Sequence, residues 1–145
     1  MRFMMIVKAD KTTEAGTPPS RADLEAMGAY NDALVKAGVL LDATGLQPSS
    51  RGARVAFPGG KPQVTDGPFA ETKELIAGYW LIDVKSKAEA IEWAKKIPSA
   101  HLPSNGRVPE VELRQLFEMT DFPDAPPEVV EMEKTFNAGR EGRKK

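Results

Sequence analysis

Four ionisable side chains lie close together near the middle of the chain, and they are the first candidates for chemistry. Asp66 follows a run that predicts a strand, and Glu71, Lys73 and Glu74 come soon after it. Loops at strand ends commonly present catalytic and binding groups, so Asp66 is a catalytic candidate. Glu71 and Glu74 share a face if they form a helical turn, and paired carboxylates can act as acid and base. We take Glu71 and Lys73 as substrate-binding candidates.

The same segment also has a structural interpretation, which stays open. Asp66 precedes Gly67 and Pro68, and an Asp side chain commonly hydrogen-bonds its own backbone in such a turn. Phe69 is expected to anchor the segment to the core. The acidic and basic residues that follow also suit exposed salt bridges.

Two further candidates lie late in the chain. His101, the single histidine, is the only side chain that ordinarily titrates near neutral pH, so it is a second catalytic candidate as a general base. An exposed loop histidine is the alternative, because the connection around it is rich in loop residues. Arg114, near Glu112 on a predicted strand, is a substrate-binding candidate for an anionic group, and an ion pair between the two residues is the alternative.

Aromatic and amide side chains supply the remaining candidates. Tyr30 is predicted on a helix, where its hydroxyl can face the rim of a site, and Trp80 lies on a strand next to Tyr79. Successive strand residues point to opposite faces, so one of these two aromatic rings faces away from the helices. We assign Tyr30 and Trp80 to substrate binding. Asn31 interrupts an apolar helix face, and we favour a bond to backbone over a bond to substrate.

The elements that position these residues follow one pattern twice. Apolar runs and turn residues predict strands at 2–8, 39–46, 54–57, 63–65, 76–84 and 108–117, and capping boxes open helices at Ser20 and Ser86, the first of which ends at Gly38. The first strand is continuously apolar between two basic residues and is expected to be buried on both faces or nearly so. The order βαβ, hairpin, βαβ predicts an α+β, ferredoxin-like fold with an antiparallel sheet and both helices on the same face.

The residue pattern of the last strand indicates what the face of the sheet away from the helices is like. Val111 and Leu113 point one way, and Glu112 and Arg114 point the other way. If the helices cover the apolar side, the mixed side stays open and suits a wet pocket or a second copy of the chain.

Residues 1–118 are expected to form one α+β domain, and residues 119–145 a C-terminal extension that is partly helical or disordered. A proline pair followed by acidic residues predicts a helix over 126–136, with Val129, Met132 and Phe136 on an apolar stripe.

Composition narrows the function classes. There is no cysteine and one histidine among 145 residues, so thiolate chemistry is excluded and we expect no metal. A net charge of −1 gives no reason to expect binding to nucleic acid or to a membrane. No phosphate-binding glycine loop, dinucleotide fingerprint or nucleophilic serine elbow is present, so we expect no cofactor, and a cytoplasmic location is the default.

The nine residues from Asp66 to Glu74, DGPFAETKE, resemble the hallmark of the DGPF-type branch of the YCII-related family. The resemblance implies a dimeric α+β barrel, in which the bare faces of two sheets pack together. It also implies that the functional centre is a His–Asp pair, with the histidine between the first strand and the first helix. This chain has Asp10 and Asp23 there but no histidine, and His101 is not at the corresponding place.

We therefore expect a homodimer that binds a small anionic organic molecule, and we leave open whether it is an enzyme. One alternative is a purely structural dimer domain with no pocket, and the other is a non-catalytic regulatory or interaction module. Proteins that resemble this one are often encoded beside, or fused to, alternative sigma factors of the extracytoplasmic-function type, so the resemblance implies such a sigma factor as the partner.

Overall fold

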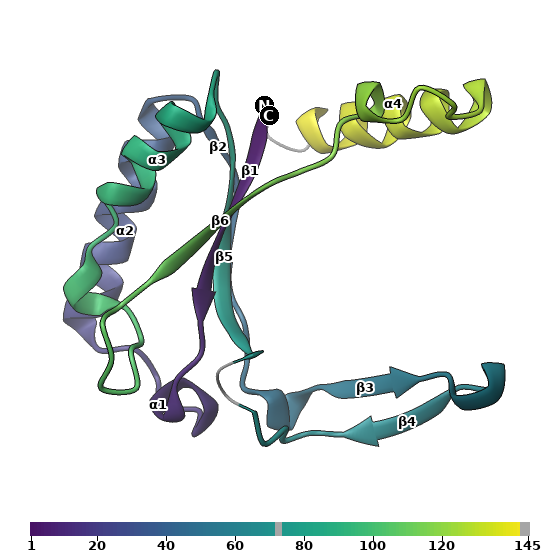
Figure 1. Ribbon diagram of the computed structural model, residues 1–145. Coiled ribbons are helices and arrows are strands. Elements are labelled where there is room, and N and C mark those ends of the chain that lie inside the picture. The colour runs from purple at the N-terminus through teal and green to yellow at the C-terminus, as the bar shows by residue number, and fades with distance from the viewer. Residues whose placement is uncertain (72–73, 143–145) are drawn as a thin grey trace. The chain divides into compact units, whose positions relative to one another are not determined.

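The computed structural model describes residues 1–71 and 74–142, and the chain divides into two compact units, Met1–Gln115 and Leu116–Lys145. In the first unit, two long helices cover one face of a four-stranded sheet (Figure 1). The second unit contains a short 3-10 turn, Met119–Asp121, and helix α4 (Pro127–Gly142), which continues beyond the predicted helix at 126–136.

The elements of the first unit follow the predicted order. They are β1 (Arg2–Lys8), α1 (Lys11–Glu14), α2 (Arg21–Lys36), β2 (Leu40–Gly45), β3 (Ala53–Ala56), β4 (Gln63–Asp66), β5 (Ile76–Asp83), α3 (Lys87–Lys95) and β6 (Val111–Gln115). The main sheet has the order β2-β5-β1-β6 with every neighbour antiparallel, and β3 and β4 form a separate hairpin. This topology confirms the predicted α+β, ferredoxin-like fold.

Local sequence signals explain where α2 begins and ends. The Ser20 side chain accepts a hydrogen bond from the backbone N–H of Asp23, and the Asp23 side chain accepts one from Ser20, which completes the predicted capping box. Gly38 follows the helix with φ of 72°, a conformation that favours glycine. The short helix α1 was not predicted, although Asp10 caps it by the same chemistry.

The core lies between the sheet and the two long helices. Phe3, Met5 and Val7 alternate along β1 and are buried against the helices, and Leu34 of α2 and Ile82 of β5 are fully buried beside them. The residues between them on β1 are only half-buried. The prediction that β1 is buried on both faces is therefore wrong, because helices cover only one face of this sheet.

The other face of the sheet is mixed in character. Met4 pairs with Leu81 and Arg114, and Ile6 pairs with Tyr79 and Glu112. Val111 and Leu113 point to the helix side, where they pack against the core. This confirms the predicted division of β6 into an apolar and a charged face, and it places Trp80 on the helix side and Tyr79 on the open side.

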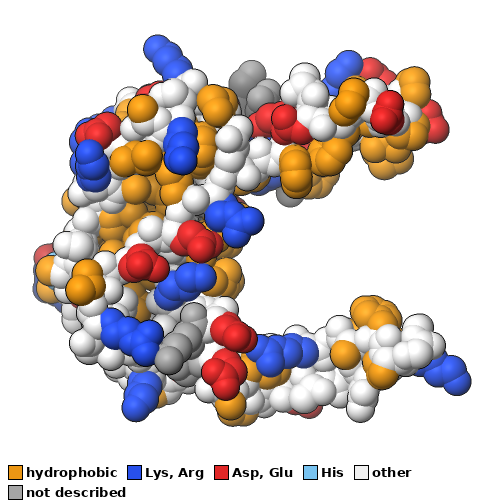
Figure 2. Space-filling model, viewed as in Figure 1, with side chains coloured by type: hydrophobic (Ala, Val, Ile, Leu, Met, Phe, Trp, Pro, Cys, Tyr) orange, Lys and Arg blue, Asp and Glu red, His pale blue; other side chains and the backbone are white. Residues whose placement is uncertain are grey.

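The hairpin of β3 and β4 is exposed along its whole length. Val55 and Val64 pair across it and are 53% and 64% exposed. Figure 2 shows hydrophobic side chains on this hairpin and on α4. Among the described residues, no helix is long and apolar enough to cross a membrane.

Candidate functional site

A cleft of about 900 Å³ lies on the helix side of the sheet, at the end where β1 finishes and β5 begins. Its floor comes from Val7, Ala43, Gly78 and Trp80, and its walls come from the first half of α2 and the connections around Thr12, Pro48 and His101. All these residues belong to the first unit, so one chain builds the cleft.

A His–Asp pair lies on the wall of this cleft. The Nδ1 atom of His101 is 2.7 Å from Oδ1 of Asp23, and the two side chains are 29% and 36% exposed. Because a carboxylate can only accept, the proton between these atoms belongs to Nδ1. When the ring is neutral, Nε2 then carries a lone pair and can accept a proton.

The start of α2 fixes the orientation of Asp23. Its Oδ2 atom accepts the backbone N–H of Ser20 at 2.9 Å, which leaves Oδ1 for His101. The hydrogen bond from His101, and after it those from Ser20, lower the pKa of Asp23 from 3.8 to about 2. Asp23 is therefore a carboxylate at neutral pH, as an acceptor for imidazole N–H must be.

Contacts between loops bring His101 to Asp23. The Asn105 side chain accepts the backbone N–H of Lys11 at 2.7 Å and donates to the carbonyl of Ala9 at 3.3 Å. Asp10, while capping α1, also accepts the backbone N–H of Ser104 at 3.2 Å. Asn105 has φ of 51°, a conformation that asparagine tolerates better than most residues. These bonds hold the loop that contains His101 against the start of α1.

The rest of the cleft is mostly apolar. Leu24, Met27, Leu46, Pro48 and Leu102 line it. The Trp80 indole N–H donates to Oδ1 of Asn31 at 2.6 Å, so the backbone partner that we favoured for Asn31 is wrong. Among the described lining residues, the carboxylates and the imidazole belong to Asp10, Asp23 and His101, and there is no lysine or arginine.

The Asp66–Phe69 segment lies away from the cleft. Asp66 is exposed at the end of β4, and neither it nor Glu71 lines the cleft. The structure therefore does not bring the two catalytic candidates, Asp66 and His101, to one place. Phe69 lies 3.9 Å under the Arg54 guanidinium and not in the main core, so the predicted anchoring of Phe69 in the core is wrong.

Ser49 connects this segment to the cleft wall. Its hydroxyl accepts the backbone N–H of Phe69 at 3.0 Å and donates to the Glu14 carboxylate, which also accepts the Ser49 backbone N–H at 3.0 Å. Glu14 belongs to α1, whose Thr12 and Thr13 line the cleft. Through these contacts the Asp66–Phe69 segment helps to fix α1, which is a structural role. The chemical role that the sequence left open for this segment is a separate question.

The four other candidates lie in different places. Trp80 lines the cleft, whereas Tyr30 is buried beneath it, where its hydroxyl donates to the Trp93 carbonyl at 2.8 Å. Arg114 is on the open face of the sheet, 3.8 Å from Glu112. Lys73 falls outside the described residues.

Sequence reasoning missed Asp23 as a functional residue. We assigned it only to the capping box, although the His–Asp pair implied by the resemblance drew attention to this region. The signal was present as an acid on the first turn of α2 and a single histidine elsewhere. Only the folded loop shows that these two residues meet.

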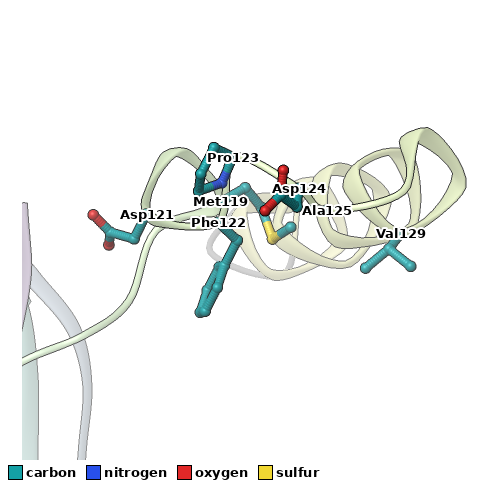
Figure 3. A pocket seen from close by; sticks show the side chains of 7 residues that line it. All are labelled: Met119, Asp121, Phe122, Pro123, Asp124, Ala125 and Val129. Atoms are coloured by element: carbon teal, nitrogen blue, oxygen red, sulfur yellow. The ribbon is translucent and has the colours of Figure 1, made fainter.

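A second hollow, of about 500 Å³, lies within the C-terminal unit (Figure 3). It is lined by Met119, Asp121, Phe122, Pro123, Asp124, Ala125 and Val129. The Asp121 side chain points away from the other labelled residues, so the polar groups do not converge there. This hollow lacks the arrangement of an acid–base site.

Comparisons with known proteins agree with the extent of the first unit. A family model described as the YCII-related domain matches residues 1–116. An uncharacterized protein of Rhizobium meliloti (strain 1021) is 42% identical over 72 residues, which make up 50% of this chain and 57% of that protein. The chain thus matches little more than half the length of that relative. The family match covers the whole sheet and every residue of the cleft.

Proposed function

The chain belongs to the YCII-related domain family, and we propose that it binds a small, mainly apolar organic molecule in the cleft, where His101 transfers a proton. The observation that supports this proposal is the pair of His101 and Asp23 on the wall of an apolar cleft. Clefts with apolar walls and a few convergent polar groups are typical ligand sites.

The proton transfer requires only the imidazole ring and its partner. Nε2 of neutral His101 accepts a proton from a C–H or O–H group of the ligand, and the bonding electrons stay on the ligand. The resulting imidazolium keeps its Nδ1–H on Asp23, whose negative charge stabilises it. In the reverse direction the same imidazolium donates the proton.

The lining of the cleft changes our expectation about the ligand. We expected an anionic molecule, with Arg114 as the candidate for holding its charge. The described lining has two carboxylates and no lysine or arginine, and an anion there would meet like charges without a cation to offset them. A neutral ligand fits this lining better.

Hydrogen exchange tests the proposed chemistry. Compounds from a panel of small ketones, lactones and phenols that raise the melting temperature would be incubated with the protein in D₂O. We expect NMR to detect deuterium entering a carbon-bound position of at least one bound compound. A ligand at about 100 times its Kd adds about 2.7 kcal/mol of stability, which a melting curve detects readily.

Two variants distinguish the cleft from the rest of the protein. His101→Gln should bind the compound but abolish the exchange. Asp32→Asn removes a carboxylate from the same helix, where it pairs with Lys36 at 2.6 Å outside the cleft, and should leave the exchange unchanged. Exchange that persists in His101→Gln would contradict the proposal.

We also propose that two copies pair through the open face of the sheet. Met4, Ile6 and Tyr79 on this face are only half-buried, and Leu81 lies among them. Light scattering after size exclusion should give a dimer mass for the natural chain and a monomer mass for Ile6→Glu. Val35→Glu, on the exposed side of α2, is the matched control and should stay dimeric.

A second candidate function is the interaction module expected for the DGPF-type branch, with an extracytoplasmic-function sigma factor as partner. The exposed apolar side chains of α4 favour it, since Val129, Met132 and Phe136 are 44%, 69% and 61% exposed. Purified sigma factors of this type from the same genome should bind the natural chain and not Met132→Glu. Equal binding by both would remove α4 from the interaction.

A further inference from the structure

We propose that Asn31 is the hydrogen-bond donor that selects the ligand, and that the cleft takes neutral, elongated molecules with an acceptor oxygen at one end. This inference rests on the proposed function of the cleft. It adds a specificity residue and a ligand class to the acid–base pair at the other end.

Trp80 fixes the orientation of the Asn31 amide. The indole N–H can only donate, and it donates to Oδ1 of Asn31 at 2.6 Å. The amide oxygen therefore faces Trp80, and the NH₂ group is turned away from it. Within the described part of the chain, this NH₂ group has no hydrogen-bond partner, although Asn31 lines the cleft.

The Trp80 ring is itself held rigidly. It is 7% exposed and lies edge-on to Tyr30, with ring centres 5.3 Å apart and an angle of 89° between the planes. The Tyr30 hydroxyl donates to the carbonyl of Trp93 at 2.8 Å, which fixes the second ring. The Asn31 donor is thus oriented in advance, so a ligand bond there requires little ordering of the protein.

The spacing along α2 sets the length of the ligand. Asp23, Met27 and Asn31 follow one another at intervals of four residues and lie on one face of the helix. Eight residues of α-helix separate Asp23 from Asn31, which corresponds to roughly 12 Å along the axis. Between them the wall is formed by Leu24 and Met27. A ligand that reaches both polar ends therefore has an apolar middle.

The carboxylates of the cleft are already hydrogen-bonded within the protein. Asp10 accepts the backbone N–H groups of Thr13 and Ser104, and Asp23 accepts from Ser20 and His101. These bonds hold both carboxylates in place, and their negative charges disfavour an anionic ligand. The Asn31 amide is a neutral donor whose direction Trp80 fixes, and it matches a carbonyl or ether oxygen.

Three naphthalene probes of matched size test this inference. 2-Acetylnaphthalene has the acceptor oxygen, 2-ethylnaphthalene lacks it, and 2-naphthoate replaces it with an anion. In the natural protein, NMR titration should show roughly tenfold tighter binding of the ketone than of the hydrocarbon. The ring signals of His101 and the side-chain NH₂ signals of Asn31 should both shift.

Asn31→Asp is the decisive variant, because it keeps an oxygen acceptor for Trp80 and replaces the NH₂ group with a carboxylate oxygen, which has no hydrogen to donate. We expect the preference for the ketone to disappear in this variant. Trp80→Phe keeps the Asn31 amide but lets it rotate, because the indole N–H that holds it is gone. This variant should show a smaller preference for the ketone and should still bind it. Melting curves would confirm that both variants are folded.

The outcomes separate this inference from the proposed function. If none of the probes binds, the cleft is not a binding site and both proposals fail. If the ketone and the hydrocarbon bind equally while the His101 signals shift, only the role of Asn31 is overturned. A preference for the ketone that survives in Asn31→Asp also overturns the role of Asn31.

Discussion

His101 Nδ1 lies 2.7 Å from Asp23 Oδ1, although 78 positions separate the two residues in the chain. Asp23 is on the first turn of α2, and His101 is in the connection between α3 and β6. The pair therefore forms only when both βαβ units are folded and the late loop is docked on α1. It reports directly on the geometry of the cleft.

The tautomer of His101 is the first prediction. The measurement is made in alkaline solution, at about pH 9, where an ordinary histidine ring carries a single proton. We expect ¹⁵N NMR of this single histidine to place the proton on Nδ1, because that atom donates to Asp23. In Asp23→Ala the proton should move to Nε2, the site preferred by a free imidazole side chain. Asp32→Ala, on the same helix but outside the cleft, should leave the Nδ1 proton in place. An unchanged tautomer in Asp23→Ala would contradict the pairing.

The acid stability of the protein is the second prediction. The pKa of Asp23 is lowered from 3.8 to about 2 in the folded state, so the unfolded chain binds more protons between these values. The stabilisation by this carboxylate is therefore complete above the unfolded value and is lost as the pH falls toward about 2. Urea unfolding should show that the natural chain exceeds Asp23→Asn in stability at pH 5, and that the difference shrinks below pH 4. A difference that stays constant down to pH 2 would be inconsistent with the lowered pKa.

Much of the fold could be predicted from the sequence because its signals are local. Ser20 and Gly38 mark the ends of α2 through hydrogen bonds and backbone angles that depend on a few neighbouring residues. The alternation of Val111 and Leu113 with charged residues predicts which side of β6 meets the helices. The limits of β6 were predicted too wide, at 108–117, because an apolar residue such as Val108 can also lie in an exposed loop, where it is 87% exposed.

The site could not be predicted in the same way, because its contacts join distant segments. Nothing near Asp23 in the sequence indicates a histidine partner, and nothing near His101 indicates a carboxylate. The docking of the late loop depends on Asn105, whose bonds to Ala9 and Lys11 cross most of the chain. The many charged residues after Asp66 drew attention to that segment. Its described contacts are instead with Ser49 and Arg54, which do not line the cleft.

The Ser49 bridge is the third prediction. Ser49→Ala removes the hydroxyl that accepts from Phe69 and donates to Glu14, and it leaves both partners without this bond. Bonds to a charged group contribute more than average, so we expect a loss of about 1–3 kcal/mol in the free energy of unfolding. Ser50→Ala, at the exposed neighbouring position, should change stability by less than about 0.5 kcal/mol. Chemical denaturation of both variants gives the comparison, and equal stabilities would show that the bridge contributes nothing.

Two glycine substitutions form the fourth prediction and should have opposite signs. Gly78 lies on β5 at the cleft floor, where an added Cβ atom would approach the Thr44 carbonyl oxygen to 2.8 Å and the Gly45 Cα atom to 3.2 Å. Both are backbone atoms, which cannot rotate away, so Gly78→Ala should destabilise the protein by about 1–3 kcal/mol. Gly28 lies within α2 with nothing within 4 Å of an added Cβ atom. Gly28→Ala should therefore stabilise the protein by about 0.5–1 kcal/mol, because alanine favours helix. Thermal melting of both variants checks the signs, and a neutral Gly78→Ala would mean that β2 and β5 do not approach as closely as this pairing requires.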